Sequence, residues 1–300
     1  MQFMFQYPDF HGIDGDMLDA GPVAELATTA EKAGWRGFAF TEHPAPTSKW
    51  LASGGHQSLD PFAALSYVAA VTTELKLLTY LAVLPYRNPM LLAKAAATVD
   101  KLSGGRMVLG VGTGYLKAEF FALGVDFEER NALFDETLDV LPLHWSGEPF
   151  DYAGRHFNAR GVMARPMPIQ KPIPVWIGGN SQLTLRRIAE RAQGWMPLVG
   201  PAEMATTTRS PHLDSVESIR GRLEMLRELA GERFDALDIT VAYIDRSVYD
   251  LSTDVERHRE ALAAFGELGA TWVIVPGPQG EHPQARDFAE GFAETYINPK

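Results

Sequence analysis

Short apolar runs alternate along the chain with longer stretches in which apolar residues recur every three or four positions. The pattern is clearest between Lys76 and Tyr115. Residues 77–84 are almost all apolar, which predicts a strand buried on both faces. Asn88 and Pro89 then predict a helix start, because an N-cap side chain precedes a ring that needs no amide donor. A helical stripe and a second apolar strand complete one strand–helix–strand unit of the kind that builds α/β folds.

This unit repeats until the chain has eight expected strands, each followed by an expected helix. Eight such units close most simply into a (β/α)8 TIM barrel of the α/β class, and a doubly wound open sheet is the alternative. Because no linker or low-complexity stretch interrupts the alternation, we expect one domain over residues 1–300. The expected strands are Phe3–Gln6, Gly37–Phe40, Leu77–Leu84, Arg106–Val111, Ile173–Ile177, Gly194–Leu198, Leu237–Ile244 and Ala270–Val275.

Three segments depart from the regular alternation. Residues 146–172 form a small insertion before the fifth strand, with a predicted hairpin at residues 150–157. We expect this insertion at the amino-terminal face of the barrel, where it serves stability or a subunit contact. Residues 45–59 follow the second strand and residues 199–213 follow the sixth, so both loops are expected on the opposite, carboxyl-terminal rim. After the later loop, Asp214 is expected to cap a helix.

Composition narrows the possible classes of function. The formal net charge of -11 argues against nucleic acid as a partner, although one small anionic ligand stays compatible with it. The chain has no cysteine, so disulfides, thiolate nucleophiles and cysteine metal sites are excluded. Neither a signal peptide nor a run of roughly 20 apolar residues is evident, so we expect a cytoplasmic protein with no membrane partner.

Polar residues at the expected strand ends form the candidate site, because active sites of such barrels lie at the carboxyl ends of the strands. Glu42 and His43 directly follow the second strand. A histidine there can exchange a proton near neutral pH, and the adjacent carboxylate can hold or charge it. The alternative is a histidine satisfied by backbone carbonyls at the start of a loop. We take His43 and Glu42 as the candidate catalytic pair.

Glycines mark two further strand ends. The run Gly110–Tyr115 matches the dinucleotide-binding fingerprint only in part, since Tyr115 stands at the third glycine position. We expect Thr113 and Gly114 to let a flat ligand lie against the backbone, with a tight strand-to-helix turn as the alternative. A second run places backbone amides at a helix start, which suits a phosphate, and ordinary capping is the alternative there. This second run is Gly178, Gly179, Asn180 and Ser181.

Other charged residues near the expected rim bear on an anion or a metal. Arg87 and Arg246 are candidates to neutralise an anion, although arginines on a rim are often only solvated. His11 and His56 join His43 on rim loops. The chain lacks the His-x-His pair of metallohydrolase barrels, and no two of its histidines are three or four positions apart, so we expect no metal site.

Five segments of the sequence, taken together and in order, resemble one protein family. They are Phe40–Pro46, Leu84–Pro89, Leu102–Arg106, Gly110–Tyr115 and Trp176–Asn180. The family is the bacterial luciferase-like flavin oxidoreductase superfamily, and the likeness is greatest to its actinobacterial branch, which uses the deazaflavin coenzyme F420. The resemblance extends over nearly the whole chain.

This resemblance implies a barrel that binds a flavin-like ring at the carboxyl ends of its strands. It implies a non-proline cis peptide between Tyr80 and Leu81 that bulges against the ring. It places Glu42 and His43 at the reactive edge of the ring, and the turn at Gly178 at the cofactor phosphate. It also implies a homodimer.

The activity implied by the resemblance is hydride transfer between F420 and a small organic substrate, with His43 as proton donor or acceptor and Glu42 holding it. Family members that oxidise sugar phosphates carry a glutamate where this chain has Tyr115, so that activity is not expected, and Tyr115 either donates a proton or walls the pocket. The alternatives are an FMN-dependent monooxygenase that uses reduced flavin and oxygen, and a non-catalytic flavin-binding protein. All three readings require that His43, Tyr80 and the Gly178 turn meet at one opening wide enough for a tricyclic ring.

Overall fold

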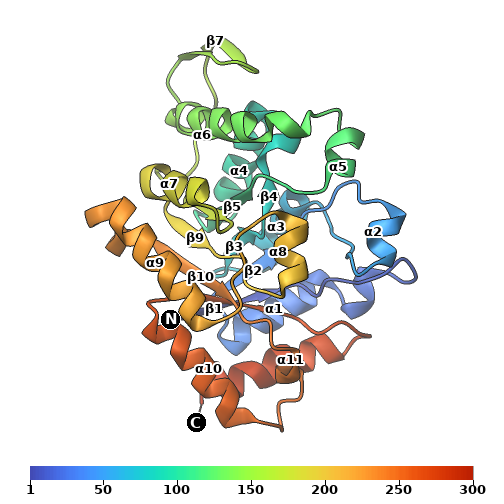
Figure 1. The fold of residues 1–300 in the computed structure, drawn as a ribbon. Helices are drawn as coiled ribbons and strands as arrows, with labels where there is room; N and C mark the ends of the chain where they lie inside the picture. Colours follow the sequence, from blue (N-terminus) through green and yellow to red (C-terminus); the bar gives the residue numbers. More distant parts are fainter. Residues whose placement is uncertain (300) are drawn as a thin grey trace.

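The computed structural model describes residues 1–299 and has a closed sheet of parallel strands at its centre (Figure 1). Neighbouring strands follow the order β3-β2-β1-β11-β10-β9-β8-β5-β4, and a further pairing of β3 with β5 closes the ring. Because β3 and β4 both pair with β5, they occupy one position in the ring. The predicted (β/α)8 TIM barrel is therefore confirmed, and the open sheet is excluded. The strands are β1 Gln2–Gln6, β2 Gly37–Phe40, β3 Lys76–Thr79, β4 Ala82–Val83, β5 Met107–Gly112, β8 Val175–Gly178, β9 Gly194–Met196, β10 Asp238–Ala242 and β11 Trp272–Pro276.

Helices surround the sheet, and most of them begin where the sequence predicted. Asp60 and Asn88 cap their helices as expected, accepting from the N–H groups of Ala63 and Met90 at 2.9 Å. The expected cap Asp214 is wrong, because Ser215 Oγ accepts from Ser218 N instead. The outer helices are α1 Val23–Ala33, α3 Pro61–Val71, α4 Pro89–Leu102, α5 Lys117–Ala122, α6 Arg130–Ser146, α7 Gln182–Arg191, α9 Val216–Ala230, α10 Val255–Glu267 and α11 Gln284–Phe292.

The two rim loops follow β2 and β9, and the insertion precedes β8, as the sequence predicted. Each rim loop contains one short helix that the sequence did not predict. These helices are α2 (Ser48–Ala52) after β2 and α8 (Ala202–Thr208) after β9. The insertion forms an antiparallel hairpin of β6 (Phe150–Ala153) and β7 (Asn158–Val162), which projects beyond α6 (Figure 1). His156 bonds Glu129 and Glu136 beside it, so this histidine anchors the hairpin.

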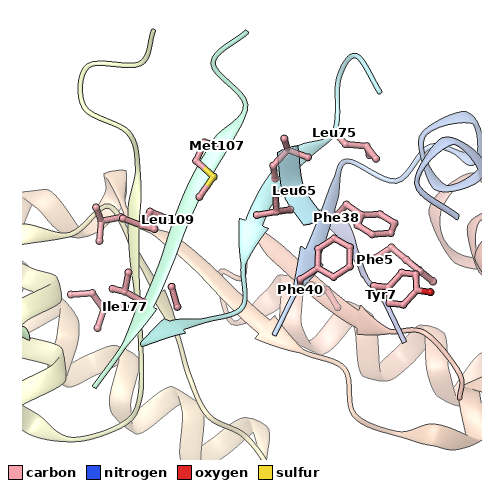
Figure 2. Close-up of a cluster of buried hydrophobic side chains, with 14 of the residues drawn as sticks. Phe5, Tyr7, Phe38, Phe40, Leu65, Leu75, Met107, Leu109 and Ile177 are labelled. Atoms are coloured by element: carbon pink, nitrogen blue, oxygen red, sulfur yellow. The ribbon is translucent and has the colours of Figure 1, made fainter. Parts of the chain in front are cut away.

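Apolar side chains fill both the inside of the barrel and the layer between sheet and helices. Successive residues of a strand point to opposite faces, so Met4 lies inside the barrel while Phe5 faces the helices. Figure 2 shows the outer layer, in which Phe38, Phe40 and Leu109 pack under the surrounding helices. The inner layer consists of Met4, Ala39, Leu78, Val108, Trp176, Met196, Trp272 and Ile274. No helix within residues 1–299 is long and apolar enough to cross a membrane.

Candidate functional site

The carboxyl ends of the strands bring the sequence-predicted residues to one edge of the barrel. Glu42 and His43 follow β2, Tyr80 and Leu81 lie between β3 and β4, and Thr113, Gly114 and Tyr115 follow β5. Gly178 ends β8, and Gly179 and Asn180 follow it. Because the strands are parallel neighbours, all these positions share the rim at which barrel active sites lie.

His43 is held firmly at this rim. Its backbone N–H donates to Ser58 Oγ at 2.7 Å, and its side chain is only 10% exposed. Its ring Nδ1 lies 3.2 Å from Glu119 Oε2. The ring centres of Trp50 and Tyr115 lie 4.4 and 5.9 Å from that of His43. Hydrogen bonds to Nε2 do not occur within residues 1–299, so this nitrogen is left to act on a ligand.

Trp50 reaches His43 from the first rim loop. Thr47 caps the short helix α2 by accepting from Trp50 N at 3.2 Å, which fixes the start of the indole-bearing turn. A Cβ atom at Gly55 would lie 2.2 Å from the Trp50 ring, so only glycine leaves room for it. His56 completes the aromatic group, with its ring centre 4.8 Å from that of His43. We call Trp50, His56 and Tyr115 the aromatic surround of His43.

Glu42 does not hold His43, which corrects the expectation from the sequence. Its Oε2 accepts from Val83 N at 2.6 Å, and its Oε1 accepts from Arg87 Nε at 3.0 Å. Adjacent residues of an extended chain point to opposite sides, so the carboxylate of Glu42 turns away from the ring that follows it. Arg87 also donates to Asp60 at 2.6 Å, so this cation is paired with two carboxylates and is not available to an anion.

The carboxylate that does contact His43 belongs to Glu119, a residue the sequence reading missed. Glu119 lies on α5 and is 1% exposed. Tyr86 donates its hydroxyl to Glu119 Oε2 at 3.0 Å, and Ala45 N donates to Oε1 at 3.2 Å. The neighbouring Phe121 is 87% exposed, so α5 buries its glutamate and exposes an aromatic ring. A hydrophobic pattern predicts the reverse, and for this reason periodicity alone passed over Glu119.

The peptide between Tyr80 and Leu81 is cis, as the family resemblance implied. The side chain of Leu81 lies against two glycines on neighbouring strands. A Cβ atom at Gly112 would lie 2.5 Å from Leu81 Cδ1, and one at Gly178 would lie 2.4 Å from Leu81 Cδ2. Gly178 therefore has a packing role that needs no ligand. Gly114 has a φ of 75°, a conformation that favours glycine.

The corner after β8 combines capping with an uncrowded backbone. Ser181 Oγ caps α7 by accepting from Thr184 N at 3.1 Å, so the capping alternative is present. Asn180 is buried, and its side-chain amide donates to Leu198 O at 2.7 Å and to Pro211 O at 2.8 Å, which ties this corner to the second rim loop. Gly179 has a φ of 118°, and a Cβ there would come no closer than 3.4 Å to any neighbour. Gly179 N donates to Met196 O at 3.1 Å and Asn180 N donates to Ser210 Oγ at 3.2 Å, so an anion at this corner would meet backbone amides that already have partners.

Three cations that the sequence reading did not select gather beside this corner. Lys117, Arg130 and Arg209 lie over the ring of Phe127, at 4.8, 3.9 and 5.0 Å from its centroid. Arg209 belongs to the second rim loop, whose Ser210 accepts from Asn180 N at 3.2 Å. Lys117 and Arg130 lie 3.4 and 3.9 Å from carboxylate oxygens of Glu128, whereas Arg209 makes no ion pair within residues 1–299 and adjoins the Gly179 turn through Ser210.

The remaining expectations concern metal and the width of the opening. His11, His43 and His56 do lie near one another, but no group of three or more metal-binding side chains occurs within residues 1–299. Surface hollows of the described chain occur beside Phe234 and beside His282, and neither is lined by His43, Tyr80 or Gly178. The width of the opening between Leu81 and His43 stays a prediction.

A closed parallel barrel with a buried histidine–carboxylate pair, glycine-rich strand ends and a non-proline cis peptide at its rim defines a class of barrel enzymes, the luciferase-like oxidoreductases and monooxygenases. The model of the luciferase-like monooxygenase family matches residues 1–267. The chain belongs to this family.

Individual relatives differ in cofactor. The uncharacterized protein Rv0940c of Mycobacterium tuberculosis is 32% identical, over 94% of this chain and 96% of that protein. An FMNH(2)-dependent dimethylsulfone monooxygenase of Pseudomonas putida is 27% identical, over 80% of this chain and 60% of that protein. Among solved structures, the coenzyme F420 dependent tetrahydromethanopterin reductase of Methanopyrus kandleri aligns over 99% of this chain and 98% of its own, with a TM-score of 0.72 and 18% identity. The names of these last two proteins give a reduced flavin and F420 as their own cofactors, and the solved structure shares the fold of this chain.

Proposed function

We propose that this protein is an F420-dependent oxidoreductase that moves a hydride between the deazaflavin and a small organic substrate, with His43 exchanging the proton. The observation that carries the proposal is the setting of His43, whose Nδ1 contacts a buried carboxylate at 3.2 Å while Nε2 is left to a ligand. A histidine held in this way at a barrel rim is suited to general acid–base catalysis. The sequence motifs of the F420-using branch support the choice of cofactor.

The residues at the rim fit a flat ring. Tyr80, Leu81, Thr113 and Gly114 would face it, since they lie at the ends of neighbouring strands. Burial, and secondarily the charge of Asp9, raises the pKa of Tyr80 to about 12, so its hydroxyl stays protonated and can donate to a ring oxygen or nitrogen. When bound, the deazaflavin supplies a carrier that accepts or releases two electrons as a hydride.

The corner after β8 fits the phosphate that both candidate cofactors carry. The phosphate would lie beside Gly178, Gly179 and Asn180 at the start of α7, where the helix dipole is favourable, and it would compete with Met196 O and Ser210 Oγ for the N–H groups of Gly179 and Asn180. Arg209, next to the Ser210 that bonds Asn180 N, would supply positive charge to the phosphate. In this proposal the turn that receives the phosphate follows β8, and the cation that neutralises the phosphate belongs to the second rim loop.

The proton and the hydride take separate routes in this proposal. In the direction of alcohol oxidation, His43 Nε2 would take the proton of the substrate O–H group, and the deazaflavin, held by the rim residues named above, would supply the acceptor for the hydride of the C–H bond, so that a carbonyl remains. The reverse reaction returns both. Burial, followed by the charge of Glu119, raises the pKa of Tyr115 to about 12, so near neutral pH this residue acts as a protonated hydroxyl or as a wall and not as a base.

An FMN-dependent monooxygenase is the second candidate, and the Pseudomonas putida relative is the observation that favours it. The two candidates share the ring site and the phosphate corner. They differ in the co-substrate, because a monooxygenase consumes oxygen and an F420 oxidoreductase does not.

Native mass spectrometry with F420 and FMN in competition tests the choice between them. We expect the F420 complex to dominate at equal cofactor concentrations, with no oxygen uptake when the bound cofactor is reduced. Arg209→Ala should weaken binding of either cofactor by about 10-fold, since charged hydrogen bonds contribute about 1.5–3 kcal/mol, and Arg160→Ala, at an exposed position of the hairpin strand β7, serves as the matched change of charge. Preferred binding of FMN with rapid oxygen uptake would replace the first candidate by the second, and binding of neither would reject both.

We also propose that the protein is a homodimer, which the family resemblance implies. Light scattering behind size-exclusion chromatography is expected to give twice the mass of one chain at micromolar concentration. A mass equal to one chain throughout that range would reject the dimer without affecting the cofactor proposal.

A further inference from the structure

The site contains two buried carboxylates near His43, and they have different partners. Glu42 is neutralised by Arg87, which donates to it from Nε and Nη2. Glu119 has no such cation among the ion pairs of residues 1–299; the basic group that lies within ion-pair distance of it is His43. Its other partners, the Tyr86 hydroxyl and the Ala45 N–H, are neutral donors. His43 is therefore the one group among these partners of Glu119 that can carry a positive charge.

This contact decides which nitrogen of the imidazole carries hydrogen. A carboxylate accepts hydrogen bonds and does not donate them, so the ring atom 3.2 Å from Glu119 Oε2 must be an Nδ1–H donor. The neutral imidazole has one N–H, which leaves Nε2 with its lone pair. In this state Nε2 can take a proton, and after taking it the imidazolium lies beside a buried negative charge.

We infer that Glu119 is the positioning residue of this site: its carboxylate fixes the neutral His43 ring in the Nδ1–H form, so that Nε2 is the nitrogen that exchanges protons with the substrate. Tyr86 and Ala45 act one step further out by holding the carboxylate in place. The catalytic consequence rests on the proposed function. The assignment of the ring hydrogen does not, because it concerns two side chains of the protein itself.

The test is nuclear magnetic resonance of protein labelled with 15N-histidine, with the His43 signals assigned by their loss in His43→Gln. Two-bond proton–nitrogen couplings distinguish the Nδ1–H from the Nε2–H form. We expect Nδ1–H in the wild type above pH 8. In Glu119→Gln we expect a substantial Nε2–H population, because an amide N–H can donate to Nδ1. The matched change Glu42→Gln, in the residue next to His43, should leave the Nδ1–H form in place.

Kinetics then separate positioning from binding. In Glu119→Gln we expect kcat to fall about 10- to 100-fold, the range typical when a group that orients a functional histidine is lost. We expect KM and the cofactor Kd to change less than about threefold, because Glu119 is covered by Ala45, Tyr86 and His43 and does not face the ligand. Glu119→Asp, which keeps the charge, should restore part of the Nδ1–H signal.

Each outcome bears on the inference. An Nε2–H form in the wild type overturns it, even if Glu119→Gln fails to fold. An unchanged Nδ1–H form in Glu119→Gln overturns it as well. If the couplings change as expected but neither F420 nor FMN supports turnover in the wild type, the proposed function fails and the role of Glu119 in setting the tautomer stands.

Discussion

The two ends of the barrel use their polar groups differently. At the amino-terminal end, the buried guanidinium of Arg106 donates every hydrogen bond it has to oxygens of the surrounding chain. Its partners are the carbonyl oxygens of Ala69, Thr72, Leu75 and Ser103 and the hydroxyl of Thr72. Glu31 acts there as the opposite charge, accepting from the backbone N–H groups of residues 73–75. At this end the charged groups of Arg106 and Glu31 are thus hydrogen-bonded within the protein itself.

At the carboxyl-terminal end, polar groups of the site lack such partners within residues 1–299, and His43 Nε2 is among them. His43 is packed by its aromatic surround and fixed at Nδ1, but Nε2 has no hydrogen bond within the described part of the chain. The contact between His43 and the buried carboxylate of Glu119 adds no obvious stability to the fold, because the desolvation of a buried ion pair often offsets its Coulomb attraction. The polar groups of the amino-terminal end thus stabilise the barrel, whereas those of the carboxyl-terminal end are placed to act on a ligand. Variants of one end should therefore change one property and spare the other.

His43→Ala is expected to have the largest effect, and only on turnover. Loss of a general acid–base typically lowers rate by about 10²–10⁴-fold, and we expect kcat to fall within this range. Cofactor affinity should change less than about threefold, since the glycine turn and the cations beside it are unchanged. Stopped-flow measurement of cofactor reduction, with titration of the cofactor in parallel, checks both. Full activity in this variant would remove His43 from the mechanism.

Arg106→Met should show the opposite behaviour. The shorter, uncharged chain leaves buried carbonyl oxygens of α3 and its following loop without donors, and each unsatisfied group costs about 1–3 kcal/mol, so we expect a loss of about 3–5 kcal/mol of unfolding free energy. Urea unfolding measures it. At a temperature where the variant is folded, kcat should match the wild type, and a large fall in kcat of the folded variant would contradict the division between the ends.

Sequence reasoning predicted the parts of the fold that depend on local chemistry. The caps at Asp60 and Asn88 were predicted because an N-cap needs only its own next turn, and both are confirmed. The strand expected over residues 77–84 instead breaks after Thr79, where Tyr80 and Leu81 turn the backbone. Composition of the run does not reveal that break, and only the family resemblance placed it.

The candidate site was predictable in position but not in partners. The rim location of His43 follows from the strand order, and the structure agrees with it. Its partner Glu119 lies 76 positions later, on a helix that follows β3, β4 and β5. Likewise, the role of Gly178 depends on Leu81, which packs against it from the turn between β3 and β4. Contacts of this kind depend on how the elements meet, and no local pattern encodes them.

Gly178→Ala tests that packing role at the carboxyl-terminal end with a smaller expected effect. The added Cβ would lie 2.4 Å from Leu81 Cδ2, so Leu81 must shift, and overpacking of this type costs about 1–3 kcal/mol. Thermal unfolding measures the change. Gly221→Ala, in the interior of α9 with no atom within 4 Å of the new Cβ, is the matched control and should stabilise by about 0.5–1 kcal/mol. Equal stability of the two variants would show that Leu81 moves freely and that Gly178 is not needed for packing.

The smallest effect we expect is a difference in pH dependence between Glu31 and Glu42. Burial alone would raise the pKa of Glu31, but the N–H groups of residues 73–75 outweigh burial and lower that pKa below its usual 4.5. The native state then holds this carboxylate's proton less tightly than the unfolded chain does, so Glu31 stabilises the fold above pH 4.5 and the contribution is lost as the pH falls. Burial raises the pKa of Glu42 above 4.5 by more than Arg87 lowers it. The contribution of Glu42 is therefore present in acid and lost as the pH rises.

Urea unfolding of Glu31→Gln and Glu42→Gln between pH 3 and pH 7 separates these two signs. Relative to the wild type, the loss of unfolding free energy in Glu31→Gln should shrink toward low pH, because the wild type loses the same contribution there. For Glu42→Gln, the unfolding free energy of the wild type should instead fall relative to that of the variant as the pH rises. The difference between the two proteins therefore shrinks toward high pH and not toward low pH. If both differences follow pH in the same direction, the carboxylates at the two ends serve the same purpose, and the contrast between a stabilising end and an acting end no longer extends to their charges.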